Sequence, residues 1–447
     1  MEKLEVADTG TVLARFEAAN IRSFRDPVEL SMVATRLAEP GAARTVRAND
    51  RGATVRLLPV ACVFGANASG KSNVLRAMAD MRGCVLHSFR SGDLDTPVPR
   101  SPFRLDVNSP TQPTRFAVDL ILDGVRHEYG FVYDDERFIE EWAYSYPRAK
   151  QTVLFEREGM KISHGTRERS RGKAVEQLLR PNALYLSTSA AAGHEMLMAL
   201  YRWFANNLVM AEAANRGLRH ARTVSLLQDE QQRNRVLDLV RVADLGIVDV
   251  RVEPLDPEFL DRVRRSVRVL HGKETDSDSA DLDVAVDAAG GLRFSHAGAA
   301  GPVEFDDRDE SLGTVVWLGL LGPMLDALRD GTVLLADELD SSLHPRLVEE
   351  VVRLFQDPVS NPCNAQLIAN AFDTALLGDS VSPRVLGRDQ VWLADKSFDG
   401  ATMLRSLADY APRKEEDLAG RYLRGRYGGV PLIDHHEFAD IVELARA

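Results

Sequence analysis

The sequence lacks most of the features that mark secreted or membrane proteins. It contains only three cysteines, Cys62, Cys84 and Cys363, which are too few and too scattered for a disulfide framework or a zinc site. No run of about 18 or more apolar residues is present, so no membrane-spanning helix is predicted. Residues 1–10 carry acidic side chains and lack the apolar core of a secretory signal. These absences predict a cytoplasmic protein without membrane contact.

The chain also lacks an excess of positive charge. Its 55 Lys and Arg residues against 67 Asp and Glu residues give a formal net charge of −12. A protein of this charge is not coated by nucleic acid, although a local basic groove could still bind it. The 447 residues are 45% hydrophobic and 27% charged, which is ordinary for a globular protein and predicts about two to three domain-sized units.

Periodicity and turn residues predict an early part rich in strands, a helical middle and a final part of mixed helix and strand. The expected strands are two short ones within 11–32, a buried one at 57–64, a hairpin of 116–122 and 127–133 around Asp123-Gly124, and a buried one at 332–336. The expected helices are 72–81, most of 174–245, a buried helix at 311–328, and 343–355. Residues 272–301 are rich in Gly, Asp, Ser and Ala and predict loops and edge strands.

Residues 65–72 read GANASGKS and fit the P-loop pattern G-x-x-x-x-G-K-[ST] between a buried strand and a helix. The two glycines allow a tight turn and close backbone approach to phosphate, which the amides of 68–72 meet at a helix N-terminus. Lys71 is expected to bridge the β- and γ-phosphates, and Ser72 to supply a hydroxyl to Mg²⁺. A glycine-rich structural turn is the alternative. The predicted nucleotide contacts are Gly65, Asn67, Ala68, Ser69, Gly70, Lys71, Ser72 and Asn73.

Residues 333–338, VLLADE, form an apolar strand that ends in two carboxylates, which is the Walker B pattern. Asp337 is expected to hold Mg²⁺ together with Ser72. Glu338 is expected to accept a proton from the attacking water, so Glu338 and Lys71 are the predicted catalytic residues. A solvated strand end is the alternative for an Asp-Glu pair considered alone.

With these motifs the chain resembles ABC-type ATPases of the SMC and RecF group. The resemblance implies two heads that sandwich two ATP molecules, each P-loop being closed by a signature loop from the other head. Residues 310–314, ESLGT, occupy the signature position just before the Walker B strand. Ser311 would reach the γ-phosphate of the partner's ATP, and Gly313 would allow close backbone approach. The alternative is a helix capped by Ser311.

A narrower resemblance is to the stand-alone AAA/ABC ATPases, subgroup fifteen, of prokaryotic defence and restriction-linked operons. Ile21-Arg22-Ser23-Phe24 resembles their opening strand motif, which implies nucleotide contacts from Arg22 and Ser23. His344 is implied as a further nucleotide contact. The other matching segments are 101–105, 127–131, 154–157, 243–247, 337–345, 392–396, 413–414 and 421–431.

Two positions depart from the ABC pattern, and the motifs do not place the Q-loop glutamine. His344 follows Leu343 where most ABC heads have Asp, as in the overcoming-lysogenization-defect branch. Phe372 stands where family members carry a switch His that contacts the γ-phosphate, so either hydrolysis is slow or Asn370, His344 or Asp373 substitutes. Gln112 is a candidate for the Q-loop glutamine by position only, and a surface loop is its alternative.

The resemblance implies an α/β fold: an ABC-type P-loop NTPase head with an N-terminal antiparallel β lobe, a short helical arm insertion and a C-terminal α/β lobe. The expected domains are 1–170 (first lobe with Walker A), 171–295 (mainly helical arm) and 296–447 (second lobe with signature, Walker B and tail). Sustained heptads are absent, so no long coiled coil is expected. Basic residues gather in 148–173 and 421–426, as a nucleic-acid patch or as a solvated loop and a structural tail.

The expected cofactors are ATP and Mg²⁺, and three functions stay open. In the first, a head dimer or larger oligomer gates a separately encoded nuclease or toxin of an antiphage-defence system, because the chain shows no nuclease constellation of its own. In the second, a RecF-like DNA-repair ATPase binds DNA directly. In the third, which Phe372 motivates, a non-hydrolysing scaffold assembles on ATP.

Overall fold

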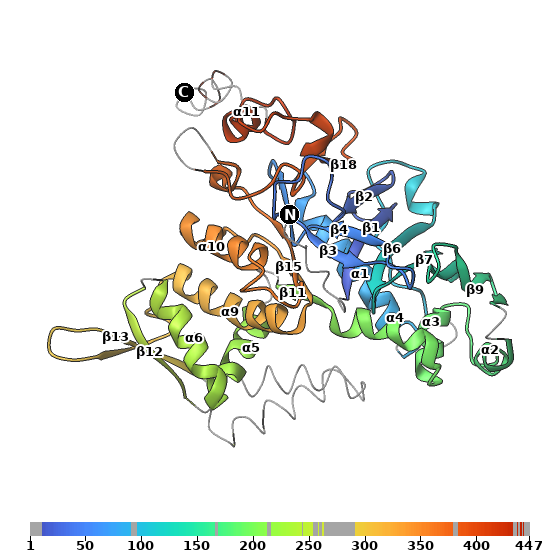
Figure 1. Ribbon diagram of the computed structural model, residues 1–447, viewed down its shortest axis with the longest axis horizontal. Coiled ribbons are helices and arrows are strands. Elements are labelled where there is room, and N and C mark those ends of the chain that lie inside the picture. The colour runs from blue at the N-terminus through green and yellow to red at the C-terminus, as the bar shows by residue number, and fades with distance from the viewer. Residues whose placement is uncertain are drawn as a thin grey trace.

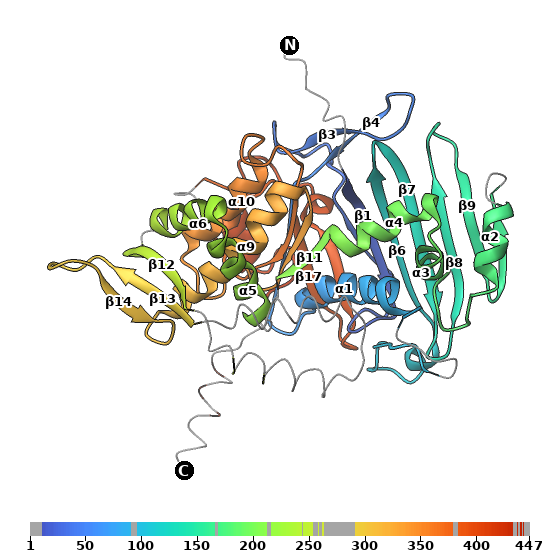
Figure 2. The same cartoon turned by 90° about the horizontal axis from the view of Figure 1, so that it is seen from below.

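The computed structural model describes residues 11–90, 96–165, 169–211, 216–243, 245–253, 291–378 and 383–431, with residues 258, 262, 436, 439 and 441. It contains a seven-stranded antiparallel sheet, a six-stranded mixed sheet, a small three-stranded sheet and a two-stranded ribbon (Figures 1 and 2). The mixed sheet is the middle layer, because buried side chains from both of its faces enter two separate hydrophobic cores.

The antiparallel sheet has the order β10-β9-β8-β7-β6-β1-β2. Its strands are β1 (Val12–Ala19), β2 (Val28–Ser31), β6 (Thr114–Leu122), β7 (Val125–Tyr133), β8 (Phe138–Ser145), β9 (Thr152–Glu158) and β10 (Lys161–His164). The predicted hairpin around Asp123-Gly124 is confirmed: both residues have positive φ, 49° and 73°, as a tight two-residue hairpin turn requires. The ribbon of β3 (Arg44–Arg47) and β4 (Thr54–Leu57) lies at one end of this sheet in Figure 2.

The mixed sheet has the order β11-β15-β16-β5-β17-β18 and draws strands from all three predicted segments of the chain. Its strands are β5 (Val60–Gly65), β11 (Leu208–Ala211), β15 (Val333–Ala336), β16 (Gln366–Asn370), β17 (Val391–Lys396) and β18 (Thr402–Ser406). Only the pair of β17 with β18 is antiparallel. The domain boundaries at residues 170 and 295 stay a prediction.

Strand β5 is buried on both faces, which explains its unbroken apolar sequence. Ala61 and Val63 enter the core shared with the antiparallel sheet, whereas Val60, Cys62 and Phe64 enter the core on the opposite side. The strand predicted at 57–64 is wrong at its start. Pro59 separates β4 from β5, because a proline cannot donate a ladder hydrogen bond.

Helices cover both faces of the mixed sheet. The helices are α1 (Lys71–His87), α2 (Arg169–Glu176), α3 (Tyr185–Ala191), α4 (Glu195–Asn206), α5 (Arg216–Gln228), α6 (Glu230–Val242), α9 (Leu312–Asp330), α10 (Pro345–Gln356) and α11 (Leu418–Leu423), with 3₁₀ turns η1 (Ser109–Thr111), η3 (Thr374–Leu377) and η4 (Leu407–Tyr410). Helices α1 and α4 lie between the two large sheets, and α5, α6, α9 and α10 lie on the other face of the mixed sheet (Figure 2). The helices predicted at 72–81, 311–328 and 343–355 are confirmed as α1, α9 and α10.

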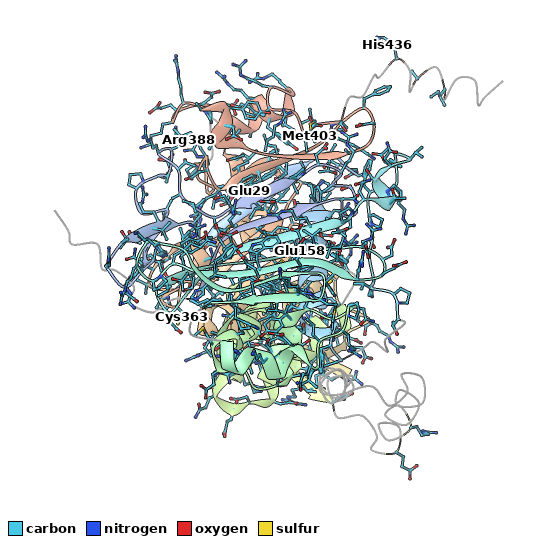
Figure 3. All side chains as sticks on the ribbon, turned by 90° about the vertical axis from the view of Figure 1, so that its right-hand side faces the viewer. Glu29, Glu158, Cys363, Arg388, Met403 and His436 are labelled. Atoms are coloured by element: carbon cyan, nitrogen blue, oxygen red, sulfur yellow. The ribbon has the colours of Figure 1, made fainter. Side chains whose placement is uncertain are left out.

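The small sheet, β12 (Ile247–Glu253), β13 (Gly291–His296) and β14 (Val303–Asp306), projects from the α5–α6 end of the molecule (Figure 1). Figure 3, seen from the side of the antiparallel sheet, places Met403 and Arg388 toward one end and Glu29 and Glu158 nearer the middle. Helix α9 is long and apolar enough to cross a membrane by length and composition, but 56% of its most apolar window is buried within the described protein. It packs on α5 and β15 as a core helix.

A fully buried ion pair joins the antiparallel sheet to the start of α3. Arg157 Nη1 lies 3.4 Å from Glu141 Oε2, and both side chains have no exposed surface. Glu141 also accepts hydrogen bonds from the amides of Tyr185 and Leu186, at 2.6 and 2.9 Å, and Arg157 donates to the carbonyl of Ala183 at 2.6 Å. Burial raises the pKa of Glu141, and the neighbouring guanidinium opposes that rise. The pair is therefore satisfied on both sides, as a buried charge must be.

Candidate functional site

The loop between β5 and α1 requires glycine at both ends. Gly70, the N-cap of α1, has φ 103°, a left-handed conformation that favours glycine. A Cβ atom there would lie 2.1 Å from Thr402 Oγ1 and 2.7 Å from Ser23 Oγ. At Gly65 a Cβ atom would lie 2.4 Å from the Ala394 carbonyl oxygen. Both ends of the loop are thus packed closely against neighbouring segments, whereas the predicted contacts Asn67 and Ala68 in its middle are exposed.

The first turn of α1 has the features of an anion site. Gly70 has no side chain that could cap the helix, and the first turn carries no acidic residue. Helices α9 and α10 differ, because Ser311 accepts from the Thr314 amide and His344 from the Arg346 amide. The first amides of a helix have no intrahelical acceptor, and the helix dipole makes this end positive. A phosphate group is the natural partner for them.

The side chain of Lys71 lies in the loop and is 5% exposed. Its Nζ donates to the carbonyl oxygens of Gly65 and Ala66, at 2.7 and 2.9 Å, and lies 3.7 Å from the centroid of the Phe372 ring. Burial lowers the pKa of Lys71 to about 8, against the opposing effect of nearby carboxylates, of which Asp340 is the largest. Burial disfavours the charged form of Lys71, and a phosphate bound at this point would favour that form, because opposite charges attract.

The Walker B carboxylates and the P-loop meet at the carboxyl ends of β15 and β16. Asn370 is fully buried and ends β16. Its Nδ2 donates to Ser72 Oγ at 3.2 Å and to Asp337 Oδ1, and its Oδ1 accepts from the Glu338 amide. The amide group of Asn370 therefore joins three segments of the chain that lie far apart in the sequence: the P-loop at Ser72, the adjacent pair Asp337 and Glu338, and the end of β16.

Ser72 and Asp337 fit a magnesium ion better than a transition metal. No group of three or more His, Cys, Asp or Glu side chains suited to a metal occurs among the residues that the structure describes. Mg²⁺ is commonly held by one or two protein ligands together with phosphate oxygens and water. Asp337 is 6% exposed, and its Oδ2 lies 3.6 Å from Arg76 Nη2, so its charge is partly balanced.

A cleft of about 340 Å³ adjoins the P-loop, lined in part by the predicted nucleotide contacts Arg22, Ser23 and Asn73. Asn73 Nδ2 donates to Ser23 Oγ at 2.7 Å. Arg22 pairs with Asp80 of α1 through two hydrogen bonds of 2.6 and 2.7 Å, so its guanidinium is engaged by a carboxylate. Ser23 and Asn73 are thus in contact beside the P-loop, whereas the Arg22 guanidinium is paired with Asp80 on α1.

The structure places Ser311, Gly313 and His344 at the starts of α9 and α10 rather than in the P-loop. Ser311 Oγ caps α9 with a 3.1 Å hydrogen bond from the Thr314 amide. A Cβ atom on Gly313 would lie 2.7 Å from the Ser342 carbonyl oxygen, so the signature segment touches the loop that follows Walker B. His344 is exposed and caps α10.

Two further residues of the site were missed from the sequence. Thr402 Oγ1 donates to the Ser69 carbonyl at 2.7 Å, and Asp340 Oδ2 accepts from the amides of Phe372 and Asp373, both at 2.6 Å. The clustering of Asp340 with Asp337 and Glu338 was a usable signal for Asp340. No local signal marks Thr402. Gln112 is exposed after η1, which agrees with the surface-loop interpretation.

The C-terminal motif of residues 421–431 packs beside the P-loop strand. The rings of Tyr422 and Phe64 lie 6.0 Å apart at an angle of 68°, and Tyr422 Oη donates to the Gly429 carbonyl at 2.9 Å. A Cβ atom on Gly429 would lie 3.5 Å from Gly65 Cα. The aromatic residues of this motif are buried in the protein, so they are not a base-stacking surface.

Comparison with solved structures finds similar chains among SMC head domains. The SMC head domain from Thermotoga maritima is 11% identical with a TM-score of 0.36, and the match covers 88% of this chain and 98% of that one. The Smc head domain with an extended coiled coil from Pyrococcus furiosus, solved bound to the C-terminal domain of ScpA, is 12% identical with a TM-score of 0.39 over 90% and 98%. The Smc head domain with a coiled coil and joint from Pyrococcus yayanosii is 10% identical, with a TM-score of 0.34 over 90% and 100%.

Comparison with curated proteins finds no match. A family model does match, over residues 60–370, which include the P-loop, the segments predicted as signature and Walker B, and the end of β16. This model is described as an AAA domain, putative AbiEii toxin, Type IV TA system. Because the match covers more than half of the sequence, the chain belongs to this family of AAA domains.

Proposed function

We propose that this protein is an ATPase that binds ATP with Mg²⁺ and hydrolyses it. The observation that carries the proposal is the meeting of Lys71, Ser72, Asp337 and Glu338 at one edge of the mixed sheet, with Asn370 between them. The family described as an AAA domain supports the same chemistry. In this proposal each site residue has the role that is predicted for it from the sequence.

In this proposal the amides of the first turn of α1 and the Lys71 ammonium hold the phosphates. Ser72 and Asp337 would hold Mg²⁺, which when bound offsets phosphate charge. Glu338 accepts the proton of the attacking water, and its exposed position at the strand end suits contact with a bound substrate. Phe372 offers no hydrogen bond to the γ-phosphate, so we expect slow turnover.

We propose further that two copies of the chain engage through their heads. Ser311 and Gly313 lie at the start of α9, outside the P-loop of their own chain. In a head dimer they would complete the P-loop site of the second copy. Engagement would bury ATP between the copies and so make the dimer depend on nucleotide.

The biological role that we propose is regulation of a separate effector, a nuclease or toxin, in an antiphage-defence system in the cytoplasm. The family description as a putative toxin of a type IV system supports a defence role. The segments 1–170, 171–295 and 296–447 would act as first lobe, arm and second lobe. ATP would change the relative populations of two head arrangements, and the effector would bind one of them more tightly.

One specific observation favours a second candidate, an ATP-dependent scaffold that does not hydrolyse. The Phe372 ring, at the position of the family's switch His, covers Lys71. In that case the protein would assemble on ATP and disassemble only by nucleotide release.

Steady-state ATP turnover, measured beside Lys71→Ala and Glu338→Gln with mass by light scattering, tests the proposal. We expect turnover by the wild type, loss of nucleotide binding in Lys71→Ala, and an ATP-dependent dimer or larger species in Glu338→Gln. ATP binding without turnover above the Lys71→Ala control would favour the scaffold. Strong salt-sensitive DNA binding by the chain alone would favour a RecF-like repair ATPase.

A further inference from the structure

The side chain of Asn370 makes all of its hydrogen bonds within the nucleotide site. A buried amide is costly unless its donors and acceptor are satisfied. Here the Nδ2 group donates to Ser72 Oγ and Asp337 Oδ1, and Oδ1 accepts from the Glu338 amide. The orientation of the amide is fixed by chemistry, because a backbone N–H can only donate and a carboxylate can only accept.

Asn370 also supports an unusual backbone conformation at Glu338. Glu338 has φ 55°, in the left-handed region that a residue with a Cβ rarely adopts. Two hydrogen bonds hold this turn. The Glu338 amide donates to Asn370 Oδ1, and the Leu339 amide donates to the Asn370 carbonyl at 3.2 Å. Strained conformations of this kind persist where the surroundings over-determine them, and they cluster at active sites.

The hydrogen bonds that Asn370 donates do not use all of the lone pairs of the two candidate ligands. Ser72 Oγ and Asp337 Oδ1 each accept one bond from Asn370, and Asp337 Oδ2 faces Arg76 at 3.6 Å. A serine hydroxyl and a carboxylate oxygen each keep further lone pairs for a cation. Asn370 thus sets the spacing between two candidate magnesium ligands without being one.

We propose that Asn370 is a positioning residue that pre-organises Ser72 and Asp337 for Mg²⁺ and holds Glu338 in its reactive orientation. This inference rests on the proposed ATPase function. Partners that orient metal ligands commonly contribute about 10- to 100-fold to metal affinity. Loss of Asn370 should therefore weaken the metal far more than it weakens the nucleotide.

The test measures the affinity of the full chain for Mn²⁺ by electron paramagnetic resonance in the presence of AMP-PNP, and the affinity for AMP-PNP alone in EDTA. For Asn370→Ala we expect about tenfold or greater weakening of Mn²⁺ binding, with the EDTA affinity unchanged. Asn370→Thr keeps one donor at the same strand position, so we expect an intermediate Mn²⁺ affinity. An unchanged Mn²⁺ affinity in a folded Asn370→Ala protein overturns the proposal.

Asn361 provides the matched control. It is also a buried asparagine, 1% exposed, but it bonds only to backbone groups of Phe355 and Ala365. Asn361→Ala should lower the melting temperature while Mn²⁺ affinity stays at the wild-type value. Equal loss of Mn²⁺ affinity in both variants would assign the Asn370 effect to stability and overturn the proposal.

The outcomes also separate this inference from the function on which it rests. If the wild type binds no AMP-PNP with Mn²⁺, both are wrong. If the wild type binds both AMP-PNP and Mn²⁺ and hydrolyses ATP, and the Asn370 variants bind Mn²⁺ as tightly as the wild type does, the ATPase stands and the positioning role alone is wrong.

Discussion

The Phe372 ring centroid lies 3.7 Å from Lys71 Nζ, so an aromatic side chain covers the amino group that is expected to hold phosphate. Phe372 is 46% exposed, and its backbone amide donates a hydrogen bond to Asp340 Oδ2. A phosphate that reaches Lys71 competes with this cation–π contact. The contact also joins the P-loop to the loop that follows β16.

Removal of the ring should tighten nucleotide binding. A cation–π contact contributes about 0.5–2 kcal/mol to the uncomplexed protein, so Phe372→Ala should raise ADP affinity about two- to thirtyfold in calorimetry. Phe398→Ala, at the fully exposed turn between β17 and β18, is the control and should change nothing. Weaker ADP binding by Phe372→Ala would mean that the ring supports the nucleotide instead.

Replacement of the ring by imidazole should speed hydrolysis. Histidine can hydrogen-bond the γ-phosphate and the attacking water, so Phe372→His should raise kcat at least about tenfold over the wild type. Steady-state phosphate release measures this, with Phe372→Ala as the matched variant that lacks both groups. If Phe372→His and Phe372→Ala turn over at the same rate, the imidazole has no catalytic role at this position.

Nucleotide binding without metal should weaken at high pH. Burial lowers the pKa of Lys71 to about 8, so the amino group loses its proton above that pH, whereas bound phosphate favours the charged form. ADP affinity in EDTA should therefore be flat below pH 8 and fall by up to about tenfold per pH unit above it. Lys71→Arg keeps its charge through this range and should show a flat profile. A wild-type profile that stays flat to pH 9.5 would contradict the lowered pKa.

The signature segment should be needed for assembly but not for nucleotide binding. Any side chain at Gly313 meets the Ser342 carbonyl, so Gly313→Val should abolish ATP-dependent dimerisation and turnover while ADP affinity stays within about twofold of wild type. Gly83→Ala in α1 meets no atom within 4 Å and serves as the control, with helix stabilisation of about 0.5–1 kcal/mol. Dimers of Gly313→Val on light scattering would place the interface elsewhere.

The buried pair of Arg157 and Glu141 should dominate the stability of the antiparallel sheet. Glu141→Gln or Arg157→Met leaves one buried charge unpaired and should cost about 3–5 kcal/mol in urea unfolding. The double variant should cost less than the sum of the two, because no charge is then left alone. The exposed pair Arg251–Glu304, with side chains 63% and 51% exposed, is the comparison and should contribute at most about 1 kcal/mol.

Local sequence signals were sufficient for two elements of the site and for one hairpin of the antiparallel sheet. The P-loop, the strand before Walker B and the hairpin at Asp123-Gly124 each carry residue types that their backbone conformation requires. The strand β11 was missed, because its four residues lie inside a stretch of helical pattern and are fixed only by pairing with β15. Thr402 was missed for the same reason: its partner Ser69 is 333 residues away. Long-range pairing leaves no periodic trace at either position.

Strand β5, which carries the P-loop, has β16 on one side and β17 on the other. Both neighbours are synthesised long after it. A growing chain on the ribosome therefore exposes an apolar strand with two open edges until β16 has emerged at residue 370, and with one open edge until β17 has emerged at residue 396. The nucleotide site cannot form early in translation, and chains interrupted before that point are expected to aggregate or to be held by chaperones.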